Sequence, residues 1–239
     1  RHTLTGLTNG RTYTISIVAT SSTGLVNESA ATTTVRLVPS ALVLQTSPTA
    51  TDTTITITSS VPTGSVVTGF VVHWLRDTSV GCSDRNQSSF TVNQGFSGSY
   101  RITGLEPGNR YTITVTVFNA AGSAPVSNAV TATTMQTNPT RGPSSVRSGT
   151  VTASSITVHW GEVSCLDRNG EITGYRAQAV RNGMVEGTAS VGGSARQATI
   201  SGLSPSTLYT VQVAAVNGAG TGLYSGVSVG TGGKLGRTK

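Results

Sequence analysis

The stretch Leu105-Glu106-Pro107-Gly108-Asn109-Arg110-Tyr111 decides the fold, because it recurs at the same distance on each side. The other copies are Leu7-Thr8-Asn9-Gly10-Arg11-Thr12-Tyr13 and Leu203-Ser204-Pro205-Ser206-Thr207-Leu208-Tyr209, and 98 residues separate successive copies. Repetition at a fixed period indicates an array of similar structural units.

Alternating apolar residues flank every copy. In the middle copy Ile102 comes before the turn, and Tyr111, Ile113 and Val115 follow it. A period of two is typical of half-buried strands, so each copy is the turn between two strands. A repeat of about 100 residues with short alternating strands predicts an all-β, two-sheet sandwich.

The tyrosine that ends each copy has a predicted structural role. We expect Tyr13, Tyr111 and Tyr209 to form tyrosine corners, with the ring inside and the hydroxyl bonded back to the backbone.

Composition limits the classes of function. The 239 residues allow about two domains, and a charged fraction of 10% argues against a disordered chain. No apolar run is long enough to cross a membrane, and no start resembles a signal peptide. The net charge of +7 is concentrated after residue 135. Nucleic-acid binding is not expected, because no aromatic residues are interleaved with these bases.

Three motifs carry a resemblance to a known family. They are the repeated Leu-to-Tyr phrase, the turns Asn119-Ala120-Ala121-Gly122 and Asn217-Gly218-Ala219-Gly220, and Ser155-Ile156-Thr157-Val158-His159-Trp160. Together they resemble fibronectin type III modules, as found in tandem arrays of sponge extracellular proteins and in adhesion-receptor ectodomains. The resemblance implies Ig-like β-sandwiches and an extracellular location, secreted or on the cell surface.

The repeat spacing divides the chain into segments. Residues 1–37 resemble only the last three strands of a module, residues 38–134 form one complete module, and residues 139–231 form a second. Residues 135–138 are a linker, and residues 232–239 are a basic flexible tail. We call the complete units the middle module and the C-terminal module.

The first segment cannot bury its apolar face alone. Either it belongs to a longer array, or another chain supplies the missing strands, and strand exchange of that kind would build fibres.

Each complete module has one tryptophan, at a different position. Trp160 lies on the second strand of its module, whereas Trp74 lies on the third strand and shares parity with Phe70 and Val72. We expect both to be core residues; the alternative for Trp74 is an exposed ring that stacks on a ligand.

The two cysteines predict a disulfide between modules. Cys82 follows the third strand of its module and Cys165 follows the second strand of the next, so the antiparallel topology brings both to the linker. Pairing with another chain or module, or two free thiols, are the alternatives.

Residues for catalysis or metal binding are not grouped in the sequence. His2, His73 and His159 have no nucleophile and acid at a suitable spacing, and no set of ligands predicts a metal ion. We therefore expect no enzyme activity and no cofactor.

Asn27 and Asn86 lie in sequons and predict glycosylation. Arg176, Arg181 and Arg196 predict a basic surface for the sulfates of a glycan or for another polyanion, including mineral.

These observations favour a structural or adhesive extracellular array that spaces and presents binding surfaces. Its expected partners are other extracellular proteins, glycans and, in fibres, further copies of the chain. A cell-surface receptor ectodomain that binds a protein or polyanionic ligand is the alternative, and an accessory module of a secreted enzyme is a third hypothesis.

Overall fold

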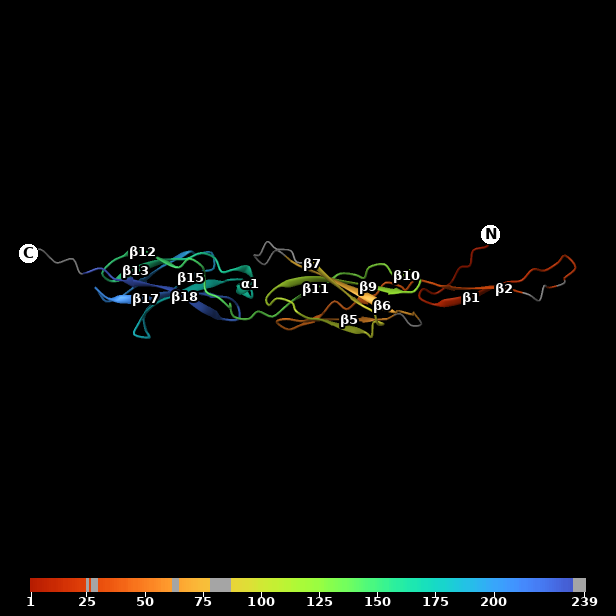
Figure 1. The fold of residues 1–239 in the computed structure, drawn as a ribbon, viewed down its shortest axis with the longest axis horizontal. Helices are drawn as coiled ribbons and strands as arrows, with labels where there is room; N and C mark the ends of the chain where they lie inside the picture. The colour runs from red at the N-terminus through yellow and green to blue at the C-terminus, as the bar shows by residue number, and fades with distance from the viewer. Residues whose placement is uncertain (25, 27–29, 62–64, 78–86, 234–239) are drawn as a thin grey trace, which may run out of the picture.

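The computed structural model describes residues 1–24, 26, 30–61, 65–77 and 87–233. The first segment, the middle module and the C-terminal module follow one another along a single line (Figure 1). The all-β fold class is confirmed, since the only helix described is a single turn.

The middle module consists of two antiparallel sheets. In the first sheet the central strand β5 pairs with three short strands, and the members are β3 (Val43–Leu44), β4 (Thr49–Ala50), β5 (Ile55–Ser60) and β8 (Ser99–Ile102). In the second sheet β9 pairs with β6, β10 and β11, and β6 also pairs with β7. Its members are β6 (Gly69–Arg76), β7 (Gln87–Val92), β9 (Arg110–Asn119), β10 (Gly122–Ser123) and β11 (Val130–Thr133).

The core of the middle module lies between these sheets. Alternate residues of β9 are buried, among them Ile113 and Val115, because successive strand side chains point to opposite faces. Phe70 makes edge-on contacts with Phe96 and Tyr100, at ring-centroid distances of 5.1 and 5.2 Å. The predicted core residue Trp74 is only partly buried and packs against the margin of this cluster.

The C-terminal module repeats the two-sheet plan. One sheet has the order β12-β13-β16, from β12 (Arg147–Val151), β13 (Ser155–His159) and β16 (Gln197–Ser201). The other has the order β15-β14-β17-β18, from β14 (Gly174–Arg181), β15 (Met184–Gly192), β17 (Leu208–Val216) and β18 (Thr221–Gly230). Trp160 is buried in its core, 5.2 Å from the ring of Tyr175.

A helical turn, α1 (Cys165–Arg168), lies in the loop between β13 and β14. The sequence predicted a plain loop there. The turn ends at Asn169, whose φ of 50° is left-handed, a conformation that asparagine adopts more readily than most residues.

The first segment is a two-stranded hairpin of β1 (Thr12–Ile17) and β2 (Ala31–Arg36). Among the described residues no second sheet covers it, so Ile17 is 68% exposed.

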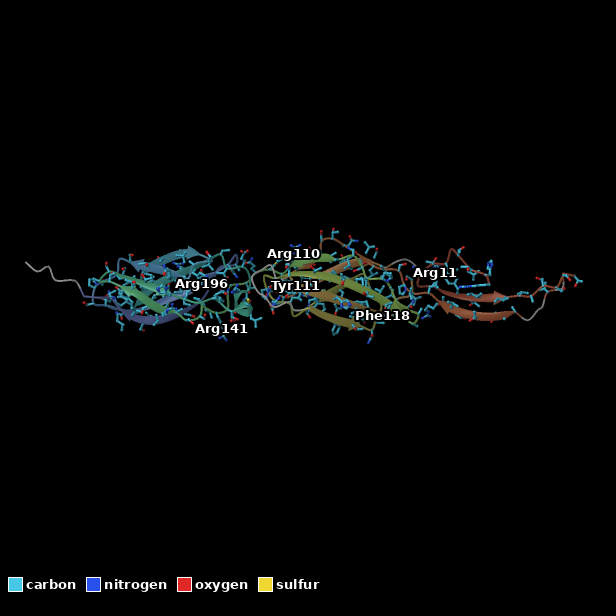
Figure 2. The ribbon with its side chains drawn as sticks, turned by 90° about the horizontal axis from the view of Figure 1, so that it is seen from above. Arg11, Arg110, Tyr111, Phe118, Arg141 and Arg196 are labelled. Carbon is cyan, nitrogen blue, oxygen red and sulfur yellow. The ribbon has the colours of Figure 1, made fainter. Side chains whose placement is uncertain are left out.

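All three repeated tyrosines have the same hydrogen bond. The hydroxyl oxygen accepts from the backbone N–H five residues upstream, in the pairs Thr8 to Tyr13 (2.7 Å), Glu106 to Tyr111 (2.9 Å) and Ser204 to Tyr209 (3.0 Å). Tyr111 lies within the middle module, and Phe118 lies toward the end that faces the first segment (Figure 2).

Candidate functional site

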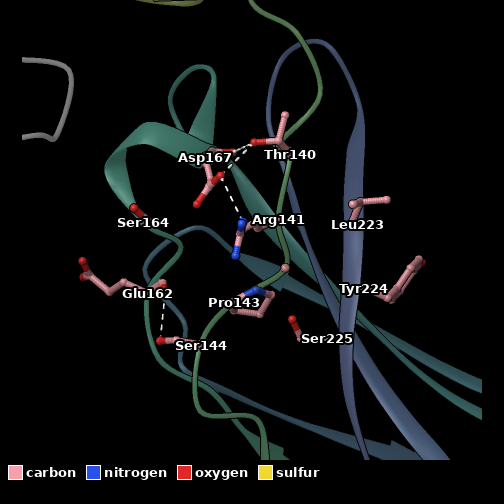
Figure 3. Close-up of a pocket in the computed structure, with 11 residues that line it drawn as sticks. Thr140, Arg141, Pro143, Ser144, Glu162, Ser164, Asp167, Leu223, Tyr224 and Ser225 are labelled. Carbon is pink, nitrogen blue, oxygen red and sulfur yellow. Dashed lines mark hydrogen bonds and ion pairs between the residues drawn. The ribbon is translucent and has the colours of Figure 1, made fainter.

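An open groove of about 700 Å³ lies on the C-terminal module (Figure 3). It lies where the start of this module passes the loop after β13 and the strand β18. The lining residues are Thr140, Arg141, Gly142, Pro143, Ser144, Glu162, Ser164, Asp167, Leu223, Tyr224 and Ser225.

Hydrogen bonds fix one wall of this groove. Thr140 donates from Oγ1 to Asp167 Oδ1 (3.0 Å) and from its backbone N–H to the Asp167 carbonyl (2.9 Å). Arg141 Nε lies 3.6 Å from the same carboxylate oxygen, and its side chain is 79% exposed. Such an exposed, long contact contributes little to stability, so the guanidinium is available at the surface.

The lining of the groove is mixed in polarity. Serine hydroxyls, the Glu162 and Asp167 carboxylates and the Arg141 guanidinium lie along it, and none of its described lining residues is a histidine or a cysteine. Leu223, 64% exposed, supplies an apolar wall beside polar groups.

Glu162 lies at the rim of the groove and binds two arginines. Arg196 Nη2 donates to one carboxylate oxygen (2.8 Å), and Arg168 Nη2 donates to the other (2.9 Å). These contacts, first the Arg196 hydrogen bond, lower the pKa of Glu162. The Arg196 guanidinium also lies 5.7 Å from the centre of the Tyr175 ring, whose pKa is raised by burial.

The three arginines predicted to bind a polyanion lie in different settings. Arg196 pairs with Glu162, and Arg181 Nε donates to Glu186 (2.6 Å). Arg176 is an exposed residue of β14, opposite Ala214 in the register. Because two of the three already have carboxylate partners, the polyanion surface stays a prediction that depends mainly on Arg176.

The remaining candidate residues are dispersed. His73 and His159 are half-buried on separate strands and His2 is exposed, and the part of the chain that is described contains no cluster of three metal-ligating side chains. The sequon residues Asn27 and Asn86 lie outside the described residues.

One cysteine can be described. Cys165, at the start of α1, is disulfide-bonded. Cys82 lies outside the described residues, so the pairing of these two cysteines stays a prediction.

Sequence reasoning missed two groups of residues. Arg76 is buried at the end of β6 and forms an ion pair with Glu106 of the repeated turn. Asn119 and Asn217 are buried at the ends of the two modules that face the preceding segment. The signal for the asparagines was present, since both begin an Asn-x-Ala-Gly turn.

Within the described residues, no helix has the length and apolar character that a membrane crossing requires.

Comparison with known proteins gives one family. The model of the fibronectin type III domain matches residues 38–133 and 141–231. Protein sidekick-2 of Mus musculus is 37% identical over 142 residues, which are 56% of this chain and 6% of that protein. Contactin-2 of Homo sapiens is 32% identical over 104 residues (44% of this chain, 9% of that protein), and cell adhesion molecule DSCAML1 of Homo sapiens is 28% identical over 155 (64% and 8%). The chain thus spans less than a tenth of the length of these relatives.

Proposed function

Because the chain belongs to the fibronectin type III family, we propose that it is part of an adhesive ectodomain at the cell surface. In this role it spaces and presents binding surfaces, and it performs no catalysis of its own. The observation that carries the proposal is the similarity to a protein named as a cell adhesion molecule, over 64% of this chain.

The outer face of the sheet β15-β14-β17-β18 is our candidate contact surface. Across this face Arg176 and Tyr224 lie on either side of Ala214 in the register, and Ala214 itself is buried. In the next row Gln178 Nε2 donates to Gln212 Oε1 (3.0 Å). A polar face with little charge and an aromatic residue suits a partner protein at the cell surface, since interfaces of this kind are depleted in lysine and acidic residues.

The test is capture of cells by beads coated with the full chain. Thr210 lies on the candidate face and Thr199 lies on the outer face of the opposite sheet, and both are exposed. Thr210→Arg should abolish capture, whereas Thr199→Arg, the same change on the other sheet, should leave it intact. Absence of capture by the unmodified chain would count against an adhesive role, and equal capture by both variants would exclude this face.

A secreted matrix array is the second candidate. The hairpin of the first segment favours it, because the outer edges of β1 and β2 have no partner among the described strands and could receive strands of another chain. Concentration-dependent fibres in electron micrographs would support this function, and a chain that stays monomeric at all concentrations would oppose it.

A further inference from the structure

The junction between the first segment and the middle module has close backbone contact. Gly10 is buried, its N–H donates to the Val38 carbonyl (2.8 Å), and its own carbonyl accepts from Val66 N–H (3.0 Å). A Cβ atom at Gly10 would collide with Ser65, in the loop between β5 and β6.

The junction between the middle and C-terminal modules repeats this arrangement 98 residues later. Gly108 is also buried, and its N–H donates to the Met135 carbonyl (3.0 Å). A Cβ atom there would lie 2.5 Å from Gly170 Cα and 2.6 Å from the Asn169 carbonyl oxygen. Real Cβ contacts are longer than this, so only glycine fits at this position.

The third copy of the turn shows why glycine is required at the other two. Ser206 takes the equivalent position, keeps a positive φ of 48°, and donates its N–H to the Gly232 carbonyl (3.0 Å). The turn therefore forms without glycine. Ser206 is exposed, whereas Gly10 and Gly108 are buried, so the close approach of the next module, and not the turn itself, excludes a side chain.

An asparagine closes each junction from the other side. Asn119 Nδ2 donates to the carbonyl of Leu37, the last residue of the first segment (2.9 Å), and to the Val66 carbonyl (3.2 Å). Its Oδ1 accepts from Ala121 N–H (2.8 Å), within the hairpin loop that it begins.

Asn217 makes the same set of bonds at the second junction. Its Nδ2 donates to the linker carbonyl of Thr137 (2.7 Å) and to the Arg168 carbonyl (3.0 Å), and its Oδ1 accepts from Ala219 N–H (2.9 Å). The Gln136 side chain adds a bond by accepting from Gly218 N–H (2.9 Å). Because both asparagines are buried, loss of one of these hydrogen bonds would leave a polar group with no partner, neither protein nor water, which costs free energy.

We propose that the pairs Gly10/Asn119 and Gly108/Asn217 are junction locks, which hold successive modules as one rigid body at a fixed relative orientation. The glycine lets the preceding turn seat against the next module, and the asparagine ties the linker to that module. The proposal is independent of which ligand the chain binds.

The test measures orientation rather than binding. Residual dipolar couplings are recorded on the full chain in a weakly aligning medium, with reductant present so that no disulfide contributes. We expect the middle and C-terminal modules of the unmodified chain to share one alignment tensor. Gly108→Ala and Asn217→Asp should abolish the common tensor and give unequal alignment magnitudes. The second change keeps the Oδ1 acceptor of the loop and replaces the amide donor by a carboxylate oxygen, which the Thr137 and Arg168 carbonyls repel.

Two controls isolate the lock. Gly104 also has a positive φ, 71°, but nothing lies within 4 Å of a Cβ placed there, so Gly104→Ala imposes the same backbone strain without the collision. Ser206→Gly changes the third turn. Both variants should keep the common tensor.

Two results would overturn the proposal. One is separate alignment tensors for the two modules of the reduced, unmodified chain. The other is a common tensor that survives both Gly108→Ala and Asn217→Asp. If Gly108→Ala does not fold, as seen from its amide spectrum, the Asn217→Asp result decides alone.

Discussion

The hydroxyl of Tyr209 donates a 2.8 Å hydrogen bond to Glu186 while it accepts a 3.0 Å bond from the backbone of Ser204. Glu186 in turn accepts from Arg181 (2.6 Å). The tyrosine corner of the C-terminal module is thereby connected to strand β15. The tyrosine at the same place in the middle module, Tyr111, accepts from the backbone of Glu106.

Removal of the Tyr209 hydroxyl should destabilise the C-terminal module. Tyr209→Phe loses two hydrogen bonds, one of them to a charged group, and we expect a cost of about 2 kcal/mol. Tyr111→Phe, the matched change, should cost only about 1 kcal/mol in the middle module. Urea unfolding followed through the amide signals of each module measures both, and an equal loss would contradict the role assigned to Glu186.

Stability should fall in acid because of Glu186. Its pKa is lowered from 4.5, first by the Tyr209 hydrogen bond and then by Arg181. A carboxyl whose folded pKa is depressed stabilises the fold fully above the unfolded pKa, and this contribution is lost as pH falls through the folded value. Glu186→Gln should therefore weaken the dependence of the unfolding midpoint on pH below about 4.5. Asp52→Asn removes one carboxylate from the middle module; it is the control and should leave the unfolding of the C-terminal module unchanged.

The pair of Arg76 and Glu106 should stabilise the middle module. The Arg76 side chain is 5% exposed and the Glu106 side chain 35% exposed. Glu106→Gln removes the charge of one carboxylate beside a buried guanidinium, and we expect a loss of about 2 kcal/mol, less than for a fully buried pair. The change in unfolding midpoint measures it. Glu171→Gln, an exposed residue, should change stability little, and equal effects of the two variants would refute the prediction.

Gly69 should not tolerate a side chain. The Phe118 ring lies across it, and an added Cβ would also come within 2.8 Å of the Val92 carbonyl oxygen. Gly69→Ala must displace the ring or the strand, so it should cost about 1–3 kcal/mol. Gly192, also in a strand, has nothing within 4 Å, and Gly192→Ala should be neutral or slightly stabilising. The thermal unfolding midpoints of both variants measure the difference. A Gly69→Ala variant as stable as the unmodified chain would contradict the prediction.

The proposed bond between Cys82 and Cys165 has a direct chemical test. The sequence contains two cysteines, and Cys165 is disulfide-bonded. We expect no alkylation of the unfolded chain without reductant, and a monomer whose cross-linked peptide contains both cysteines. In the chain-entropy model a loop of about 80 residues contributes about 4 kcal/mol. A reducible dimer, or two thiols that react before reduction, would exclude the bond.

The sequence alone determined the kind of fold, because period-two burial and a recurring turn depend only on neighbouring residues. The recurrence of Tyr13, Tyr111 and Tyr209 predicted the sandwich and its repeat length, and the structure has the expected bond at each. Only the tertiary structure decided which residues join the modules. Asn217 and Thr137 are 80 residues apart along the chain, and their contact, like the collision that excludes a side chain at Gly108, arises only when separate modules pack together. Local periodicity does not predict contacts between residues so far apart along the chain, because such contacts depend on how whole sheets and loops are placed.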